Sequence, residues 1–185
     1  MLYTKNITMV KMILTVILLT TASFAQGNKN IPDASFINLK NGVAFEVSPY
    51  TGSMGKSGVF GLRLSMNYSS LNLELSGSQV IGKTANLYPI SFNFLLNLST
   101  KGHLLPYGTL GGGLFLVNPT NAIGAETVST MAINFGGGIR YYITRSFGLR
   151  FDAKQFVTSV TEASEGNDEL LIFQEITLGV TFMFR

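Results

Sequence analysis

The chain has 185 residues, which is enough for one domain, and its formal net charge at pH 7 is only +3. It has no cysteine, which excludes a disulfide framework and a thiolate metal site, and no block of like charges, which argues against nucleic acid as a partner. Charged residues make up 12% of the chain, against roughly 25% in soluble domains, yet beyond the N-terminal segment no apolar run reaches the ~18 residues of a membrane helix. We therefore expect an all-β protein with an extensive apolar surface.

Residues 1–25 have the layout of a secretory signal peptide. Lys5 and Lys11 precede an apolar run at 12–19, and Ser23 and Ala25 supply the small residues that a signal peptidase requires. We expect cleavage after Ala25; the alternative is a buried N-terminal helix. Residues 26–41 are polar and rich in turn formers, and we expect them to form a flexible periplasmic lead-in.

From residue 42 to residue 185 apolar and polar residues alternate with period two, which is typical of strands that have two different faces. The pattern predicts eight strands. Their expected ranges are 42–48, 59–68, 71–80, 87–98, 107–117, 128–143, 147–157 and 172–184.

The expected connections alternate in length along the chain. Three of them are short, at 68–71, 99–106 and 143–147. The other four are mostly longer and polar, at 49–58, 81–86, 118–127 and 158–171. Outer-membrane barrels have this layout, with the short turns on the periplasmic side.

The apolar faces of these strands are large and aromatic. In the second strand Phe60, Leu62 and Leu64 alternate with Gly61 and Arg63. An eight-stranded interior only just holds its own side chains, so such faces are expected to meet lipid, and an open edge in lipid would leave backbone groups unpaired. We therefore predict a closed eight-stranded antiparallel up-and-down transmembrane β-barrel. The alternative is a secreted soluble barrel with its apolar faces turned inward.

The opposite, inward faces carry charges that cancel. By parity they hold four acids and four bases: Glu46, Arg63, Glu74, Arg140, Arg150, Asp152, Lys154 and Glu175. An isolated buried charge is costly, so we predict a salt-bridge network across the lumen. The alternative is that parity fails at strand ends and some of these groups are solvated.

Two glycine triplets, 111–113 and 136–138, fall within neighbouring expected strands. Glycines there would let the wall bend and leave room for long basic side chains. A phosphate-cradling loop is the alternative, but neither triplet is followed by a helix start or a GK[ST] sequence.

Three segments carry a family resemblance: PYGTLGGGLFLV (106–117), INFGGGIRYYITRSFGLRFDAK (133–154) and the terminal ITLGVTFMFR. They resemble the outer membrane protein β-barrel domain family, with the small OmpA-like and OmpX-like barrels as relatives, over residues 42–185. Members of this family end in an assembly signal that the barrel-insertion machinery reads. The positions that match this signal are Thr177, Gly179, Phe182 and Phe184. Arg185 departs from the pattern, because an aromatic residue usually ends the chain.

The sequence contains no pattern of residues that indicates catalysis or metal binding. His103 is the single histidine, it falls in an expected turn, and we interpret it as a solvated residue. We expect no catalytic residues, no cofactor and no metal site, since no nucleophile–base pair or metal-ligand spacing is present.

The leading functional hypothesis is a small bacterial outer-membrane barrel with a structural or surface-interaction role, closed by side chains rather than open as a pore. Its candidate surface comprises the loop at 118–127 and the acidic loop at 161–169, which could bind divalent cations or be merely solvated. The alternatives are an accessory subunit of a larger secretion or uptake complex and an outer-membrane lipid-modifying enzyme. Expected partners are outer-membrane lipid and lipopolysaccharide, the assembly machinery during insertion, and an envelope protein.

Overall fold

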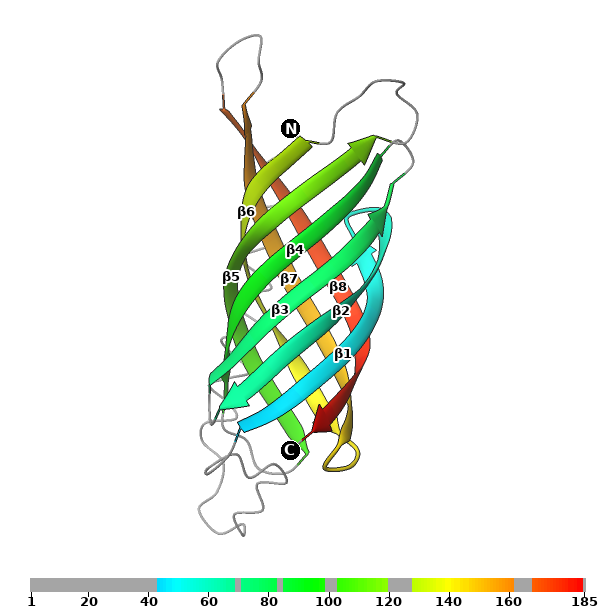
Figure 1. Ribbon diagram of the computed structural model, residues 1–185, viewed down its shortest axis with the longest axis vertical. Coiled ribbons are helices and arrows are strands. Elements are labelled where there is room, and N and C mark those ends of the chain that lie inside the picture. The colour runs from blue at the N-terminus through cyan, green and yellow to red at the C-terminus, as the bar shows by residue number, and fades with distance from the viewer. Residues whose placement is uncertain are drawn as a thin grey trace. The chain divides into compact units, whose positions relative to one another are not determined.

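The computed structural model describes residues 43–68, 71–82, 85–98, 103–119, 128–161 and 168–184, and their fold is a single closed barrel. Eight strands form from these residues: β1 (Val43–Met54), β2 (Ser57–Tyr68), β3 (Leu71–Ile81), β4 (Ala85–Asn97), β5 (Leu104–Pro119), β6 (Val128–Tyr142), β7 (Phe147–Thr161) and β8 (Asp168–Phe184). Each strand pairs antiparallel with its neighbours in the chain, and β1 pairs with β8 to close the ring (Figure 1). The predicted fold class is confirmed.

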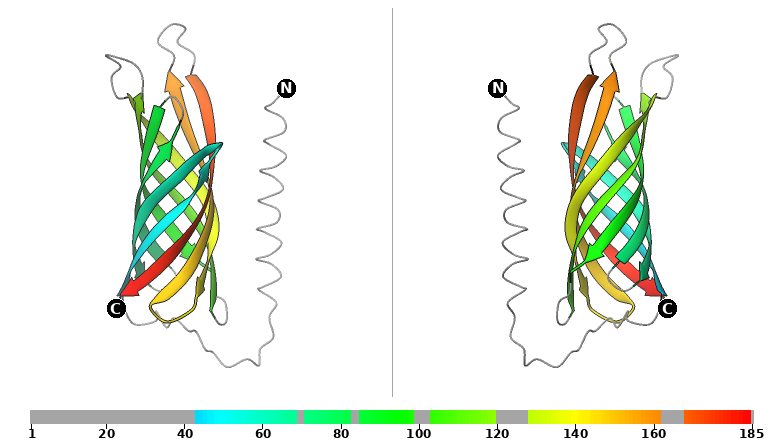
Figure 2. Two further views of the ribbon diagram at one scale, coloured as in Figure 1. Left: turned by 90° about the vertical axis from the view of Figure 1, so that its right-hand side faces the viewer. Right: turned by 90° about the vertical axis from the view of Figure 1, so that its left-hand side faces the viewer.

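The strands tilt strongly around the barrel and divide its connections between two ends (Figures 1 and 2). We call the end with the β1–β2, β3–β4, β5–β6 and β7–β8 connections the loop end. The opposite turn end has the other three connections and the last residue of β8. Among the described residues there is no helix long and apolar enough to cross a membrane.

The first hairpin corrects the expected loop at 49–58. β1 and β2 continue through this segment and meet at a tight turn at Gly55 and Lys56, where Gly55 has φ of 60°. Pro49 and the glycines of this segment suggested a loop, but a proline is tolerated where a strand's pairing is interrupted. The register of β1 with β8 covers residues 45–47 and resumes at Tyr50, so the proline falls in the interruption.

Three other expected strands were too short, and several expected segments lie outside the described residues. β5, β7 and β8 all extend further toward the loop end than their alternation suggested. The signal peptide and lead-in at 1–41 lie outside the described residues, as do 120–127 and 162–167, which make up most of the two loops expected to form a surface.

The outer face of the barrel is apolar over most of its height, which confirms the expected orientation of the strand faces. Side chains such as Leu64, Leu110 and Leu178 are 48%, 63% and 59% exposed. Tyr68 and Tyr141 face outward close to the turn end, where an amphipathic ring suits a membrane interface. A wall of this kind is built for contact with lipid.

Near the loop end apolar residues face the lumen, and polar residues face outward at several positions among exposed apolar residues such as Ile172 and Leu170. The outward and inward neighbours are Ser53 and Met54 in β1, Gln79 and Val80 in β3, Asn86 and Leu87 in β4, Gln155 and Phe156 in β7, and Gln174 and Phe173 in β8. The interior is therefore layered. An apolar cluster near the loop end lies above the charged residues, and a smaller cluster of Ala44, Tyr142, Met183 and Leu105 lies near the turn end.

Candidate functional site: the charged lumen

The middle of the lumen is occupied by ionised side chains. The structure places there all eight charges that parity assigned to the interior: Glu46 (β1), Arg63 (β2), Glu74 (β3), Arg140 (β6), Arg150, Asp152 and Lys154 (β7), and Glu175 (β8). None of these residues is more than 2% exposed. β-Strand side chains alternate between the two faces of the wall. The group is therefore assembled from one inward position on each of five strands and three successive inward positions on β7.

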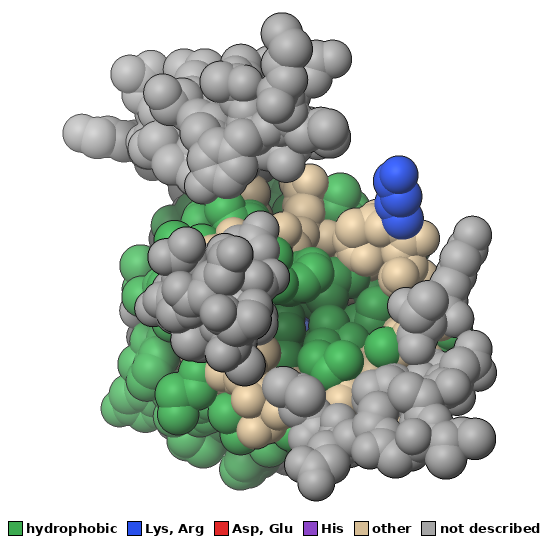
Figure 3. Space-filling view, turned by 90° about the horizontal axis from the view of Figure 1, so that it is seen from above, with side chains coloured by type: hydrophobic (Ala, Val, Ile, Leu, Met, Phe, Trp, Pro, Cys, Tyr) green, Lys and Arg blue, Asp and Glu red, His purple; other side chains and the backbone are tan. Residues whose placement is uncertain are grey.

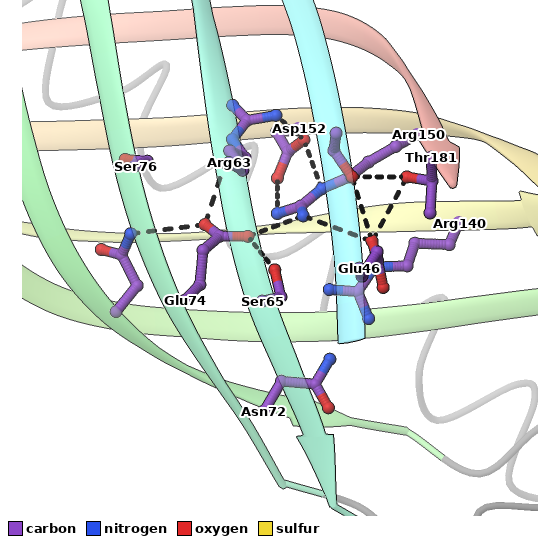
Figure 4. Close-up of polar contacts among 12 residues, drawn as sticks. Glu46, Arg63, Ser65, Asn72, Glu74, Ser76, Arg140, Arg150, Asp152 and Thr181 are labelled. Carbon is purple, nitrogen blue, oxygen red and sulfur yellow. Dashed lines mark hydrogen bonds and ion pairs between the residues drawn. The ribbon is translucent and has the colours of Figure 1, made fainter. Parts of the chain in front are cut away.

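Arg150 is the centre of this charge network (Figure 4). Its guanidinium lies 2.6 Å from the Glu74 carboxylate, 3.0 Å from Asp152 and 3.8 Å from Glu46. Three carboxylates from three strands thus share one cation, which joins β1 and β3 to β7 across the lumen.

The remaining cations complete a single connected network. Arg63 lies 2.8 Å from Asp152, 3.4 Å from Glu175 and 3.9 Å from Glu74. Lys154 lies 3.2 Å from Glu74, and Arg140 lies 3.3 Å from Glu46. With four acids and four bases in contact, the lumen has no net charge, which is the condition under which buried ions are tolerated.

Hydroxyl and amide groups donate further hydrogen bonds to the carboxylates that the cations contact. Ser48 and Thr181 each donate to Glu46 at 3.2 Å. Ser65 donates to Glu74 at 3.2 Å, and Asn93 donates to it at 3.3 Å. These neutral donors fix the rotamers of the acids, so the network is held in one arrangement.

Three inward tyrosines belong to the network and were missed by the sequence analysis. The Tyr50 ring lies 3.6 Å from the Arg63 guanidinium, and Tyr142 donates to Glu46 at 3.3 Å. Tyr107 donates to Asp152, accepts from Arg150 at 2.8 Å and lies under both Arg140 and Arg150. Each contact is a cation–π interaction or a charge-assisted hydrogen bond, so the three tyrosines are part of the network.

A cross-strand pattern in the sequence could have revealed these tyrosines. Each one is directly paired with a glycine on a neighbouring strand: Tyr50 with Gly61 and Gly179, Tyr107 with Gly138, and Tyr142 with Gly148. A ring leaning over a glycine fills the space that a side chain would take. Finding such pairs requires the register, which the sequence alone does not provide.

Gly138→Ala is expected to lower the free energy of unfolding by about 1–3 kcal/mol, the usual cost of overpacking. A Cβ at this position would overlap the Tyr107 hydroxyl and the Phe151 carbonyl oxygen. Urea unfolding in lipid vesicles, followed by circular dichroism, measures the effect. Gly108→Ala is the matched control, because its Cβ would have no atom within 4 Å. Equal stability of the two variants would contradict the packing of Tyr107 against Gly138.

His103 is not part of the network. It lies at the turn end, where its Nδ1 donates to the Tyr142 carbonyl at 2.6 Å and its ring lies 6.0 Å from that of Tyr141. It therefore has a structural contact that the sequence analysis did not foresee. Within the described ranges no three His, Cys, Asp or Glu side chains are grouped so that they could hold a metal ion.

The four residues that resemble an assembly signal lie on β8. Thr177 faces the lumen, where it accepts a hydrogen bond from Arg63 at 2.9 Å, and Gly179 is buried against Tyr50. Phe182 and Phe184 face outward and are 41% and 57% exposed. Their recognition by an insertion machinery stays a prediction, but the arrangement gives β8 an aromatic outer edge at the turn end.

Solved structures share this fold, although no protein-family model and no curated protein matches the sequence. The N-terminal β-barrel domain of Pseudomonas aeruginosa OprF is 20% identical, with a TM-score of 0.60 over 76% of this chain and 97% of that one. Neisserial surface protein A is 14% identical, with a TM-score of 0.59 over 77% and 96%. The outer membrane enzyme PagL is 13% identical, with a TM-score of 0.50 over 74% and 98%. Such identities show the fold alone, and the fold is that of small eight-stranded outer-membrane barrels.

Proposed function

Starting from the fold that the chain shares with small outer-membrane β-barrels, we propose that it is an integral outer-membrane protein of a Gram-negative bacterium with a structural or surface-interaction role. Its lumen is closed, and it is neither a pore nor an enzyme. Outer-membrane lipid and lipopolysaccharide surround its apolar wall, and the barrel-assembly machinery inserts it.

The charge network is the observation that carries this proposal. Arg150 and Arg63 reach carboxylates on other strands within 2.6–3.9 Å, so the section that they span is filled by paired side chains. An ion or solute could pass only if several buried pairs separated together, and each broken pair leaves a buried charge without compensation. A lumen of this kind supports a closed barrel.

The proposal that the protein is not an enzyme rests on a separate observation. The acids of the lumen are held by cations: Glu74 contacts Arg63, Arg150 and Lys154, and Asp152 contacts Arg63 and Arg150. A general acid or base must exchange its proton with a substrate, which such fixed and enclosed carboxylates are badly placed to do. PagL has the same fold and is an enzyme, so fold alone does not decide this point.

Planar-bilayer recording tests the closed lumen. The wild-type protein is expected to give no stepwise conductance, because the network fills the barrel, while a heat-dependent shift in gel mobility reports that the barrel is folded. Arg150→Ser, which removes the central side chain, serves as the comparison and is expected to raise the frequency of brief openings. Stable conductance steps from the folded wild-type protein would contradict the proposal.

In this proposal the protein contacts other molecules through its loop end, with the segments 118–127 and 161–169. An accessory role in a larger envelope complex is the alternative that the same surface would serve. Cross-linking in whole cells from a reactive group at Lys56, in the β1–β2 turn, would distinguish the two. Lipopolysaccharide adducts alone would favour an independent barrel, and one stoichiometric protein adduct would favour the complex.

A further inference from the structure

The lumen near the loop end is lined by apolar side chains. Its buried members are Tyr50, Met54, Val59, Val80, Phe115, Ala132 and Phe156, and Leu87 and Phe173 pack against them while partly exposed. We call this set the apolar collar. Val59, Val80 and Leu87 form one directly paired row across β2, β3 and β4. Seen from the loop end, hydrophobic side chains surround a recess in the barrel (Figure 3).

Polar atoms without partners lie immediately below the collar. Asn134 is completely buried, and neither its Nδ2 nor its Oδ1 has a hydrogen-bond partner among the described residues. The same holds for Asn93 Oδ1 and Thr109 Oγ1 within those ranges. Native proteins leave few buried polar atoms unsatisfied, and these four atoms, unlike the arginine nitrogens of the charge network, have no ion pair nearby in the described part of the chain to compensate them.

The register brings these atoms to one part of the wall. Asn93 in β4 pairs with Gly111 in β5, and Gly111 pairs in turn with Asn134 in β6. On the other side Asn134 pairs with Phe156 of the collar. Gly111, and the inward positions Gly113 and Gly136 beside it, project no side chain into the lumen there. The polar atoms therefore form a floor that adjoins the collar.

We propose that this half of the lumen binds a neutral amphiphile with a single apolar chain. The chain would lie within the collar, and the polar end would bond to Asn134, Asn93 and Thr109. Asn134 offers both a donor and an acceptor, which a hydroxyl group satisfies at once. The charge network below the floor is already balanced, so a charged end would remain unpaired, and the narrow interior admits only one chain.

The site is a closed-ended cup and goes beyond the proposed function. The ligand enters and leaves at the loop end, because the charge network occupies the section below Asn134. Sites of this composition, largely apolar with a few convergent polar groups, are typical of small-molecule binding.

The test uses 1-octanol with the protein in lipid nanodiscs and follows side-chain amide resonances by NMR. Asn134 and Asn93 are expected to shift saturably. Asn72 and Asn97, buried amides near the turn end, are internal controls and should not shift. 1-Fluorooctane has the same chain but no donor, so it should bind about threefold to tenfold more weakly, the factor expected for one neutral hydrogen bond. Octanoate should also bind more weakly.

Two variants separate the parts of the site. Asn134→Leu keeps a similar volume and is expected to abolish the preference for 1-octanol over 1-fluorooctane. Ala132→Leu fills the collar and is expected to weaken both ligands, with folding checked by heat-dependent gel mobility. If the wild-type Asn134 amide shifts no more than Asn72 and Asn97, the unpartnered atoms bind only water and the proposal is wrong. An unchanged preference in folded Asn134→Leu would also overturn it.

Discussion

Arg150→Met is expected to lower the free energy of unfolding by about 3–5 kcal/mol, the usual cost of removing one partner from a buried ion cluster. The substitution keeps much of the side-chain volume but leaves Glu46, Glu74 and Asp152 without their shared cation. It also removes the donor to the Tyr107 hydroxyl. Urea titration in lipid vesicles, followed by circular dichroism and by the heat-dependent gel shift, gives the midpoint and slope.

The control for Arg150→Met is Arg145→Met, which changes the same residue type in the exposed β6–β7 turn. Surface substitutions of this kind usually stay within about 0.5 kcal/mol of the wild type. Similar losses in the two variants would mean that the buried network does not stabilise the barrel, and a loss below about 1 kcal/mol for Arg150→Met would contradict the same claim.

Leu178→Arg is expected to destabilise the inserted barrel by about 2–4 kcal/mol, because a charged side chain on the lipid face is costly near the middle of the bilayer. Leu178 lies in the central part of β8 and is 59% exposed. Leu170→Arg is a closely matched control, since Leu170 lies on the same face of the same strand and is also 59% exposed. It is nearer the loop end, where the cost falls to about 0–1 kcal/mol.

This pair of variants also tests the orientation of the wall. In a water-soluble barrel both leucines would face solvent, and both substitutions would be nearly neutral. Urea unfolding in vesicles separates the cases, and repeating it in bilayers of different thickness shows whether the penalty follows depth. Two equally small effects would contradict a lipid-facing outer surface at Leu178.

The sequence predicted the barrel well wherever one face of a strand was consistently apolar. In β2 the alternation of Leu62, Arg63 and Leu64 determined both the strand and its orientation, and the structure agrees. The same parity identified which charges turn inward. The parity did not predict which acid contacts which base. Arg63 and Asp152, for example, are 89 positions apart in the sequence and meet only because the sheet closes into a ring.

The loop end could not be predicted, for a physical reason. Alternation was interpreted with lipid as the outer solvent, so two segments with outward polar residues, 49–58 and 81–86, were assigned to loops, whereas Gln79, Gln155 and Gln174 lie within expected strands. Ser53 and Met54 lie in an expected loop, and so does Asn86. Phe156 lies next to Val157 and five positions after Phe151, in a stretch where both faces carry apolar residues. An aromatic residue there can serve either face, and only the register decides.

The outward Gln174 of β8 gives a measure of the height of the uninterrupted apolar wall between it and the turn end. From Phe184 to Gln174 the strand β8 spans ten positions, about 34 Å along the chain and about 26 Å along the axis at a tilt of about 40°. This height is close to the ~25 Å apolar band of outer-membrane barrels. The six positions from Gln174 to Asp168 then continue for about 15 Å toward the loop end.

The upper part of the barrel differs from the lower part chiefly in what fills its lumen. Its lumen is lined by apolar side chains such as Phe156 and Phe173, and its outer face is mixed, because Gln174 is followed toward the loop end by Ile172 and Leu170, which are 55% and 59% exposed. The lower part has an apolar outer face and ion pairs inside. One continuous set of strands thus encloses two different interiors, one stabilised by apolar contacts and the other by ion pairs.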